Sequence, residues 1–213
     1  MVASNLVEPG EEVLLLNSGY FGEAFTDCLQ GAWPCIAFEL THTVYGAKVT
    51  ELKAPIGDRP GPEELEKALK SKSGSPYKLV VFTQFVALMV LGSDELSVDT
   101  STGVLSDAKA IGETVKKLSP SSLVILDGVC AVASERIEFD SWGIDVIISA
   151  SQKGLGTPPG LSVTVFSQKA LKVVEDRKAA PTSYYCSIKR WLPIMQGYEK
   201  GTPACASHDF ALD

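Results

Sequence analysis

The sequence predicts an α/β fold built on a mainly parallel β-sheet with helices on both faces. Two observations carry this prediction. Short apolar runs alternate with longer amphipathic stretches along most of the 213 residues. Most of these runs are apolar at nearly every position, which is typical of strands that are buried on both faces. Strands of this kind that alternate with helices form parallel sheets covered on each side.

Six apolar runs predict strands, at residues 12–17, 47–53, 78–83, 122–128, 145–150 and 161–167. Amphipathic stretches between and after them predict helices at residues 19–29, 61–72, 107–118 and 168–178. The helix at 61–72 carries acidic residues in its first turn, where the helix dipole favours them. Asp107 is the predicted N-cap of the helix at 107–118, because its carboxylate can accept a hydrogen bond from a free backbone amide.

Two stretches do not fit this alternation. Residues 29–43 interrupt the passage from a helix to the next strand, and residues 85–97 add a second apolar run after the strand at 78–83. We interpret both as insertions into an otherwise regular α/β chain. No internal repeat or low-complexity tract accompanies them.

Composition excludes several classes of protein. Apolar residues make up 45% and charged residues 21% of the chain, a balance typical of a globular protein. The net charge of −7 argues against nucleic-acid binding, which needs a basic face. No apolar run is long enough to span a membrane, and no signal peptide begins the sequence. The five cysteines show neither zinc-site spacing nor a disulfide framework, which indicates reduced thiols in an intracellular compartment.

Polar residues at the predicted carboxyl ends of strands are the candidates for chemistry, because ligands bind there in open α/β sheets. Asp127 ends one strand, Lys153 follows the next, and Thr100 and Ser101 lie in the loop DTSTG. Lys153 stands 26 residues after Asp127, which is room for a crossover and one strand. An isolated strand-end Asp commonly caps a turn and an isolated Lys commonly lies on the surface, so the pair by itself leaves those structural alternatives open.

Pyridoxal phosphate is a cofactor that needs such a pair. A lysine amine forms a Schiff base with its aldehyde, and an acid beside its pyridine nitrogen keeps that nitrogen protonated. The glycines and prolines of GLGTPPG, directly after Lys153, predict a tight turn that lets the backbone pass close to a ligand.

The longer stretch around this pair resembles the class V, fold-type I aminotransferases, and in particular their alanine–glyoxylate and serine–pyruvate branch. The matching motifs are Asp127 followed by small residues, GID at 143–145, ASQK at 150–153 and PPG at 158–160. NSGYFGEAF, DTSTGVLSD and APTSYYCSIKRWL match the same branch. Cysteine desulfurases, which share the class, carry a His where this sequence has Gln152.

The resemblance implies a role for each matching residue. Lys153 would be the Schiff-base lysine and the proton-shuttling base, and Asp127 the partner of the pyridinium nitrogen. The remaining cofactor contacts would come from Phe21 and Val129 on the two ring faces, Thr100 and Ser101 on cofactor oxygens, and Gln152 at the phosphate end. The implied reaction is a ping-pong transfer of an amino group from alanine or serine to glyoxylate or pyruvate, giving glycine.

The resemblance also implies a homodimer without nucleic-acid or membrane partners and an intracellular location, in the peroxisome, the mitochondrion or the cytosol. It implies the large domain of this fold, with a seven-stranded sheet. Residues 1–204 are expected to form part of that domain, truncated at both ends. Residues 205–213 are expected to be an aberrant tail, and the small C-terminal domain, with its substrate-binding arginine, is expected to be absent.

These departures predict that the chain as written binds pyridoxal phosphate weakly or not at all, and they leave two alternatives. One is an inactive fragment that at most associates with full-length subunits. The other is a nucleotide-binding Rossmann domain, for which NSGYFG and GLGTPPG are poor matches, since neither is GxGxxG after a first strand.

Overall fold

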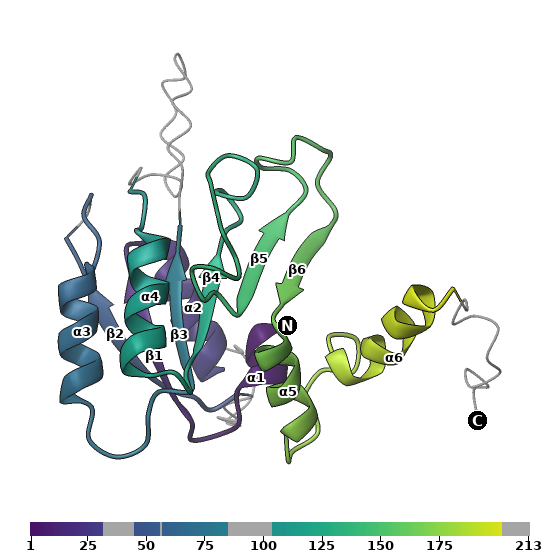
Figure 1. Cartoon of the computed structure of the whole chain (residues 1–213), viewed down its shortest axis with the longest axis horizontal. Coiled ribbons are helices and arrows are strands. Elements are labelled where there is room, and N and C mark those ends of the chain that lie inside the picture. Colours follow the sequence, from purple (N-terminus) through teal and green to yellow (C-terminus); the bar gives the residue numbers. More distant parts are fainter. Residues whose placement is uncertain (32–44, 56, 85–103, 202–213) are drawn as a thin grey trace, which may run out of the picture.

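A six-stranded sheet forms the centre of the protein, as a computed structural model shows (Figure 1). The structure describes residues 1–31, 45–55, 57–84 and 104–201. Its strands are β1 (Glu12–Asn17), β2 (Lys48–Lys53), β3 (Leu79–Thr83), β4 (Leu123–Asp127), β5 (Val146–Ala150) and β6 (Ser162–Phe166). Its helices are α1 (Val2–Leu6), α2 (Tyr20–Gln30), α3 (Pro62–Ser71), α4 (Ala108–Leu118), α5 (Gln168–Asp176) and α6 (Ile188–Glu199).

The strand order is β2-β1-β3-β4-β5-β6, and the first five strands are all parallel. β6 pairs antiparallel with β5 at one edge of the sheet. The predicted mainly parallel α/β fold is therefore confirmed, with six strands in the described residues where the resemblance implied seven. The short helix α1 and the C-terminal helix α6 were not predicted.

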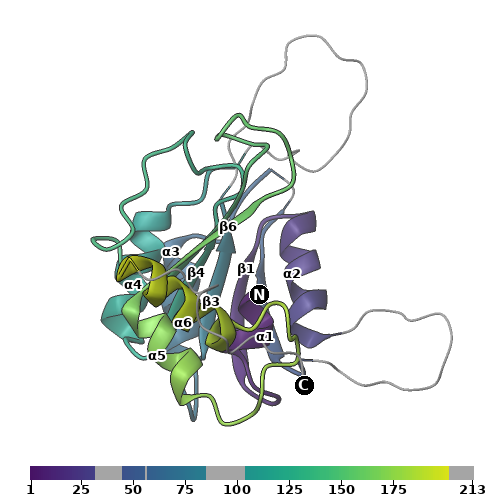
Figure 2. The ribbon, with the colours of Figure 1, turned by 90° about the vertical axis from the view of Figure 1, so that its right-hand side faces the viewer.

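Helices cover both faces of the sheet, as the sequence predicts (Figure 2). On one face, Val13, Leu15, Val81 and Ile125 pack in a core that includes residues of α1, α2 and α5. On the other face, the alternate strand residues pack with α3 and α4. This two-sided burial explains why the central strands read as continuous apolar runs.

Capping hydrogen bonds form at the starts of two of the predicted helices. The side chain of Asp107 accepts a hydrogen bond from the amide of Ala110 at 3.0 Å, as expected for an N-cap. α3 begins with Pro62, and Glu64 accepts a hydrogen bond from the amide of Gly61. Both helices therefore begin within one residue of their predicted starts.

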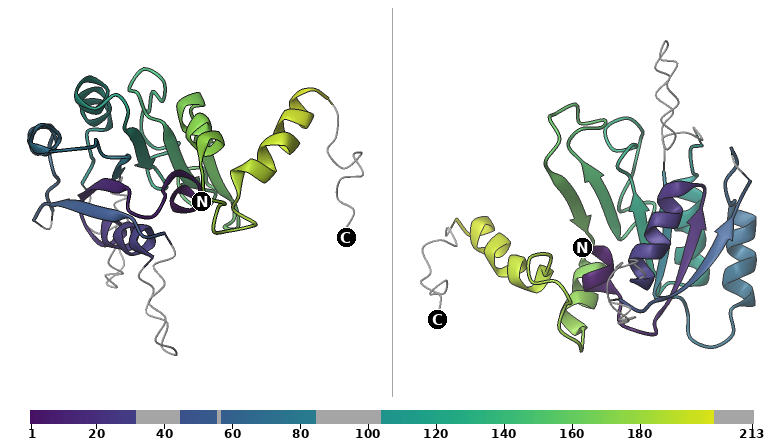
Figure 3. Two further views of the ribbon diagram at one scale, coloured as in Figure 1. Left: turned by 90° about the horizontal axis from the view of Figure 1, so that it is seen from below. Right: turned by 180° about the vertical axis from the view of Figure 1, so that it is seen from behind.

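Helix α1 anchors the last part of the described chain. Asn5 is fully buried, its Nδ2 donates to the carbonyl of Cys186 at 2.7 Å, and its Oδ1 accepts from the amide of Ile188 at 2.9 Å. Glu8 accepts hydrogen bonds from the amides of Lys178 and Ala179. These contacts fix the start of α6, which then extends away from the sheet (Figure 3).

Most of the two predicted insertions lies outside the described residues, as does the predicted aberrant tail at 205–213. Of the first insertion, Leu29 belongs to α2 and is buried in the core. No helix in the described ranges combines the length and the apolar character needed to cross a membrane.

Candidate functional site at the carboxyl edge of the sheet

Buried polar residues lie together where the parallel strands end, along the side of the sheet that we call the carboxyl edge. Strands β1, β3 and β4 end there at Asn17, Thr83 and Asp127, and strand register places Thr83 directly beside Asp127. Residues that are buried and polar at this edge are Asn17, Ser18, Thr83, Gln84, Ser106, Asp127, Ser149 and Ser151. Such a concentration is unusual for a sheet interior and marks a binding edge.

Asp127 is the carboxylate of this site. It is only 8% exposed, and its Oδ1 accepts a hydrogen bond from the amide of Val129 at 3.1 Å. Burial raises the pKa of the Asp127 carboxyl, and the Val129 amide offsets only part of that rise. No Lys, Arg or His of the described ranges forms an ion pair with it. A cationic hydrogen-bond donor beside such a buried acid would stabilise its charged form.

Lys153 lies in the loop that follows β5, and its side chain is exposed. The loop is closed by its own hydrogen bonds: Ser151 Oγ donates to the carbonyl of Pro158, and the amide of Gly156 donates to the carbonyl of Lys153 at 2.9 Å. The residue after Lys153 is Gly154, where an added Cβ would lie 2.3 Å from the carbonyl oxygen of Val132. The lysine therefore sits on a turn that presses against the loop after β4.

Asp127 and Lys153 lie within electrostatic range of the same thiol. Burial raises the pKa of the Cys130 thiol, the charge of Lys153 lowers it and the charge of Asp127 raises it further. Cys130 follows Asp127 by three residues and is half-buried. Both charges therefore act on Cys130, and the shared crevice of Asp127 and Lys153 stays a prediction.

Phe21 stands in the first turn of α2, which begins where β1 ends. Its side chain is 37% exposed, and its ring makes an edge-on contact with Tyr20 at a centroid distance of 5.5 Å. Helix α2 packs on the sheet face where Ile125 also lies, and Asp127, two residues after Ile125 on the same strand, shares that face. Phe21 is therefore at the same edge and on the same face as Asp127.

The other predicted site residues divide into two groups. Val129 is half-buried beside Asp127, and Gln152 is exposed beside Lys153, so both lie in the two loops that form the site. Thr100 and Ser101 lie outside the described residues. The roles of all these residues remain predictions.

Sequence reasoning missed the inner polar residues of this edge. Ser18 Oγ and Thr83 Oγ1 are hydrogen-bonded at 3.2 Å, and Ser106 Oγ donates to the carbonyl of Thr83. Gln84 Oε1 and Ser149 Oγ are buried and have no hydrogen-bond partner among the residues that the structure describes. The available signal was a polar residue directly at the end of a fully apolar strand, which singles out Thr83 as well as Asp127.

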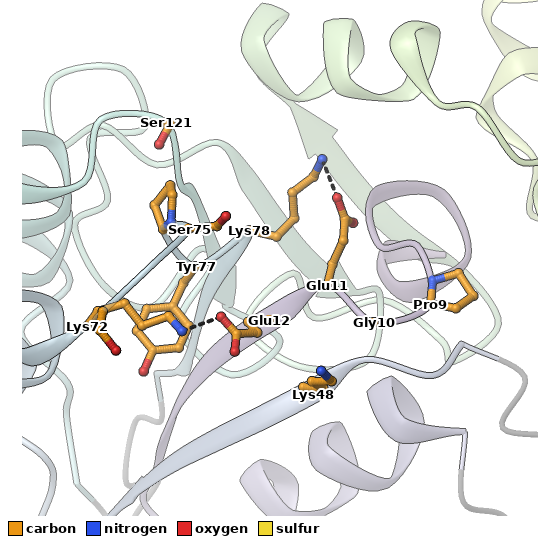
Figure 4. A pocket seen from close by; sticks show the side chains of 12 residues that line it. Pro9, Gly10, Glu11, Glu12, Lys48, Lys72, Ser75, Tyr77, Lys78 and Ser121 are labelled. Carbon is orange, nitrogen blue, oxygen red and sulfur yellow. Dashed lines mark ion pairs between the residues drawn. The ribbon is translucent and has the colours of Figure 1, made fainter.

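A large surface pocket lies at the opposite edge of the sheet, where β1, β2 and β3 begin (Figure 4). It has a volume of about 780 Å³, and two ion pairs line it, Lys78 with Glu11 at 3.0 Å and Lys72 with Glu12, together with Lys48. Neither Asp127 nor Lys153 lines it. In the described residues, no group of three or more His, Cys, Asp or Glu is arranged to hold a metal ion.

The residues at the carboxyl edge fit pyridoxal phosphate. A buried carboxyl without a cationic partner suits a protonated pyridine nitrogen, and an exposed lysine on the neighbouring loop suits the cofactor's aldehyde. An aromatic ring at the same edge suits stacking on the pyridine.

Comparison with known proteins gives a consistent result. The Aminotransferase class-V family model matches residues 79–208. The chain is 34% identical over 208 residues to alanine–glyoxylate aminotransferase 1 of Saccharomyces cerevisiae, covering 95% of this chain and 46% of the yeast protein. It is 30% identical to the alanine–glyoxylate aminotransferase of Felis catus, covering 96% of this chain and 41% of the cat protein.

A crystal structure of alanine–glyoxylate aminotransferase from Nostoc sp. superposes with a TM-score of 0.71 at 27% identity, covering 92% of this chain and 43% of that one. The chain thus spans less than half the length of these relatives. On the family match and the fold together, the chain belongs to the class V aminotransferases, whose cofactor is pyridoxal phosphate.

Proposed function

We propose that this chain is part of a pyridoxal-phosphate-dependent transaminase with Lys153 as its Schiff-base lysine. The reaction is the transfer of an amino group from a small amino acid, alanine or serine, to glyoxylate or pyruvate, with glycine as the product from glyoxylate. The two half-reactions alternate in a ping-pong cycle. The relatives named alanine–glyoxylate and serine–glyoxylate aminotransferase support these substrates.

The observation that carries the proposal is the placement of Asp127 and Lys153 at the carboxyl ends of two adjacent parallel strands, β4 and β5. Asp127 is buried at the end of β4 with no ion-pair partner in the described ranges, and Lys153 follows the adjacent parallel strand. A buried carboxylate is expensive unless a cation meets it, so a fold that retains one at a ligand-binding edge supports a cationic ligand group there.

Each residue then has one task. Pyridoxal phosphate, when bound, supplies an aldehyde that condenses with amines and a ring that takes up an electron pair from a substrate carbon. The Asp127 carboxylate holds a proton on the ring nitrogen, and Lys153 Nζ removes the α-proton of the amino acid and returns it. Phe21 and Val129 bound the ring on its two faces and exclude water from them. Gln152, Thr100 and Ser101 orient the polar substituents.

Reductive trapping tests this proposal without relying on turnover. The protein is titrated with pyridoxal phosphate and treated with borohydride, and mass spectrometry locates the reduced adduct. We expect an adduct on Lys153 that Lys153→Ala abolishes and Asp127→Ala weakens, even where affinity is low. Adducts spread over surface lysines, with no preference for Lys153, would refute the proposal.

A second candidate function is that of a subunit partner without catalytic activity of its own. In this alternative the chain is inactive and associates with full-length subunits of the same family. Co-expression of the chain, carrying an affinity tag, with an untagged full-length relative separates the two. Co-purification without Lys153 trapping supports the inactive partner, and trapping on the isolated chain supports the transaminase.

The predicted location is intracellular, in the peroxisome, the mitochondrion or the cytosol. The free thiols of Cys28, Cys130 and Cys186 support a reducing compartment. Tagging the protein and imaging it against compartment markers tests this assignment. A homodimer is the proposed assembly, and analytical ultracentrifugation tests it; sedimentation as a monomer would contradict it.

A further inference from the structure

We propose that Asn17 is a positioning residue that fixes the first turn of α2, and with it the Phe21 ring, through hydrogen bonds to Gly19 and Glu51. The inference deepens the proposed function and rests on it only for the role of Phe21, which is to bound one face of the cofactor ring. Asn17 ends β1 and is 4% exposed. It is the first residue of the NSGYFGEAF motif, in which the sequence alone assigns it no role.

The side chain of Asn17 makes two different hydrogen bonds. Its Oδ1 accepts from the amide of Gly19 at 2.9 Å, and its Nδ2 donates to Oε2 of Glu51 at 3.2 Å. The first bond closes the turn between β1 and α2. The second ties the same side chain to the neighbouring strand β2, so the turn is held against the sheet.

Glu51 determines which way the Asn17 amide points. Burial raises the pKa of the Glu51 carboxyl, but hydrogen bonds from Thr26, Lys53 and Asn17 outweigh burial and leave that pKa below its ordinary value. The charged carboxylate can only accept hydrogen bonds. Nδ2 of Asn17 must therefore face Glu51, and this leaves Oδ1 to receive the amide of Gly19.

Helix α2 is in direct contact with this pair. A Cβ on Gly22 would lie 2.3 Å from Asn17 Oδ1, so only a glycine lets the helix come this close. Thr26, one turn further on, donates to Glu51 Oε1 at 2.6 Å. The first two turns of α2 thus rest on the Asn17–Glu51 pair, and Phe21 projects from the first of them.

The same turn is linked to the candidate site. Ser18, which follows Asn17, is hydrogen-bonded to Thr83, and Thr83 lies beside Asp127 in the sheet. β1 and β4 are separated only by β3, so their ends are about 10 Å apart, two strand spacings. A shift of the β1–α2 turn therefore changes how Phe21 faces a ring bound at Asp127.

Exchanging the donor and the acceptor in this pair tests the inference. Asn17→Asp places two carboxylates against each other. Glu51→Gln leaves one oxygen where Asn17 and Thr26 each now donate to an oxygen of their own, so one of these two donors faces an amide NH2 instead. The double variant restores a donor–acceptor pair, because the new amide at position 51 can donate to the new carboxylate at position 17. That carboxylate still accepts from the amide of Gly19. Val115→Ala, in the core on the opposite face, is the matched control for lost stability.

Two readouts are needed. In the first, Phe21→Trp protein labelled with 5-fluorotryptophan adds one ¹⁹F resonance to those of the native tryptophans. We follow the added resonance, that of the tryptophan at position 21. It should be a single line in this protein and in its Val115→Ala variant, shifted or split when either Asn17→Asp or Glu51→Gln is added, and single again when both are added. An unchanged line in both single variants, or a double variant that does not recover it, overturns the inference.

In the second, the yield of the borohydride-trapped Lys153 adduct is measured with Phe21 intact. We expect the yield to fall about tenfold in each single variant, because that is the factor that corresponds to losing one hydrogen bond to a charged group. The yield should recover in the double variant. An equal fall in Val115→Ala, or no fall in the single variants, refutes positioning. If the unmutated protein gives no adduct, the proposed function fails, and the ¹⁹F line alone decides the role of Asn17.

Discussion

Gly154→Ala is the sharpest test of how the fold presents Lys153. The added Cβ would lie 2.3 Å from the carbonyl oxygen of Val132 and 2.6 Å from Oγ of Ser134. Ser134 Oγ can rotate away, but the Val132 carbonyl belongs to the backbone of the loop after Asp127. The loop that carries Lys153 must therefore move away from the loop that carries Asp127.

The size of that movement follows from ordinary contact distances. A carbon approaches a carbonyl oxygen to about 3.3 Å, so relieving the clash needs a shift of roughly 1 Å. Overpacking of this kind costs about 1–3 kcal/mol of unfolding free energy. A misplacement of about 1 Å between reacting groups can lower a rate by about 100-fold. We expect a moderate loss of stability and a large loss of Lys153 trapping by pyridoxal phosphate and borohydride.

Gly156→Ala is the matched control in the same turn. Gly156 has a φ of +65°, but no atom lies within 4 Å of the position of an added Cβ. Alanine there costs about 1–2 kcal/mol of backbone strain without pushing the two loops apart. Urea unfolding measures the stability of both variants, and the rate of Lys153 trapping measures the displacement. Equal trapping rates in the two variants would refute the close approach of Gly154 as the feature that places Lys153.

Three further predictions concern other parts of the molecule. Burial raises the pKa of the Asp127 carboxyl, so the cofactor-free protein loses stability as the pH rises from the unfolded-state pKa through the raised folded-state value. Asp127→Asn should remove that fall in urea unfolding measured over a pH series, and an unchanged pH dependence would contradict the assigned cause. Asp145→Ala should lower the unfolding free energy by about 1–3 kcal/mol, because the buried amide of Val124 and the Ser167 hydroxyl lose their acceptor. Of the Asp145 contacts, Lys169→Met removes only the ion pair with Lys169, so an equal loss in that variant would argue against this account. Asn5→Leu should increase hydrogen exchange in the first turn of α6 while β3 and β4 stay protected, and equal protection in α6 would show that α1 does not anchor it.

The transcript tests the interpretation of residues 29–43 and 85–97 as insertions. If both segments are unspliced intron sequence, we expect the mature message to lack them. A message that encodes both of them intact contradicts this interpretation.

The central strands were predictable because their burial on both faces leaves a continuous apolar pattern. β1, β3 and β4 begin and end within a residue of the predicted runs. The helices were predictable from amphipathic spacing and caps, such as Asp107. α1 was missed because five residues are too short for a periodic signal, and it forms only because Asn5 and the core around Leu6 hold it.

The candidate site was predictable where its residues lie at the ends of apolar strands. Asp127 and Lys153 meet that condition, and the ASQK and PPG motifs added the resemblance that named a cofactor. Thr83, Ser18 and Asn17 are polar residues of ordinary type. Their importance depends on partners that lie up to 65 residues away in the sequence, at the nearest positions of neighbouring strands.

By itself the sequence determined the α/β class and the order of strands and helices along the chain, and it supplied the prediction that Asp127 and Lys153 hold pyridoxal phosphate. These follow from local patterns, because burial and capping act on neighbouring residues. Only the tertiary structure decided that β6 runs antiparallel, that Gly154 fits against Val132, and that Asn17 donates a hydrogen bond to Glu51 and lies against Gly22 of α2. Such features depend on distances between segments remote in sequence, which hydrophobic periodicity does not encode.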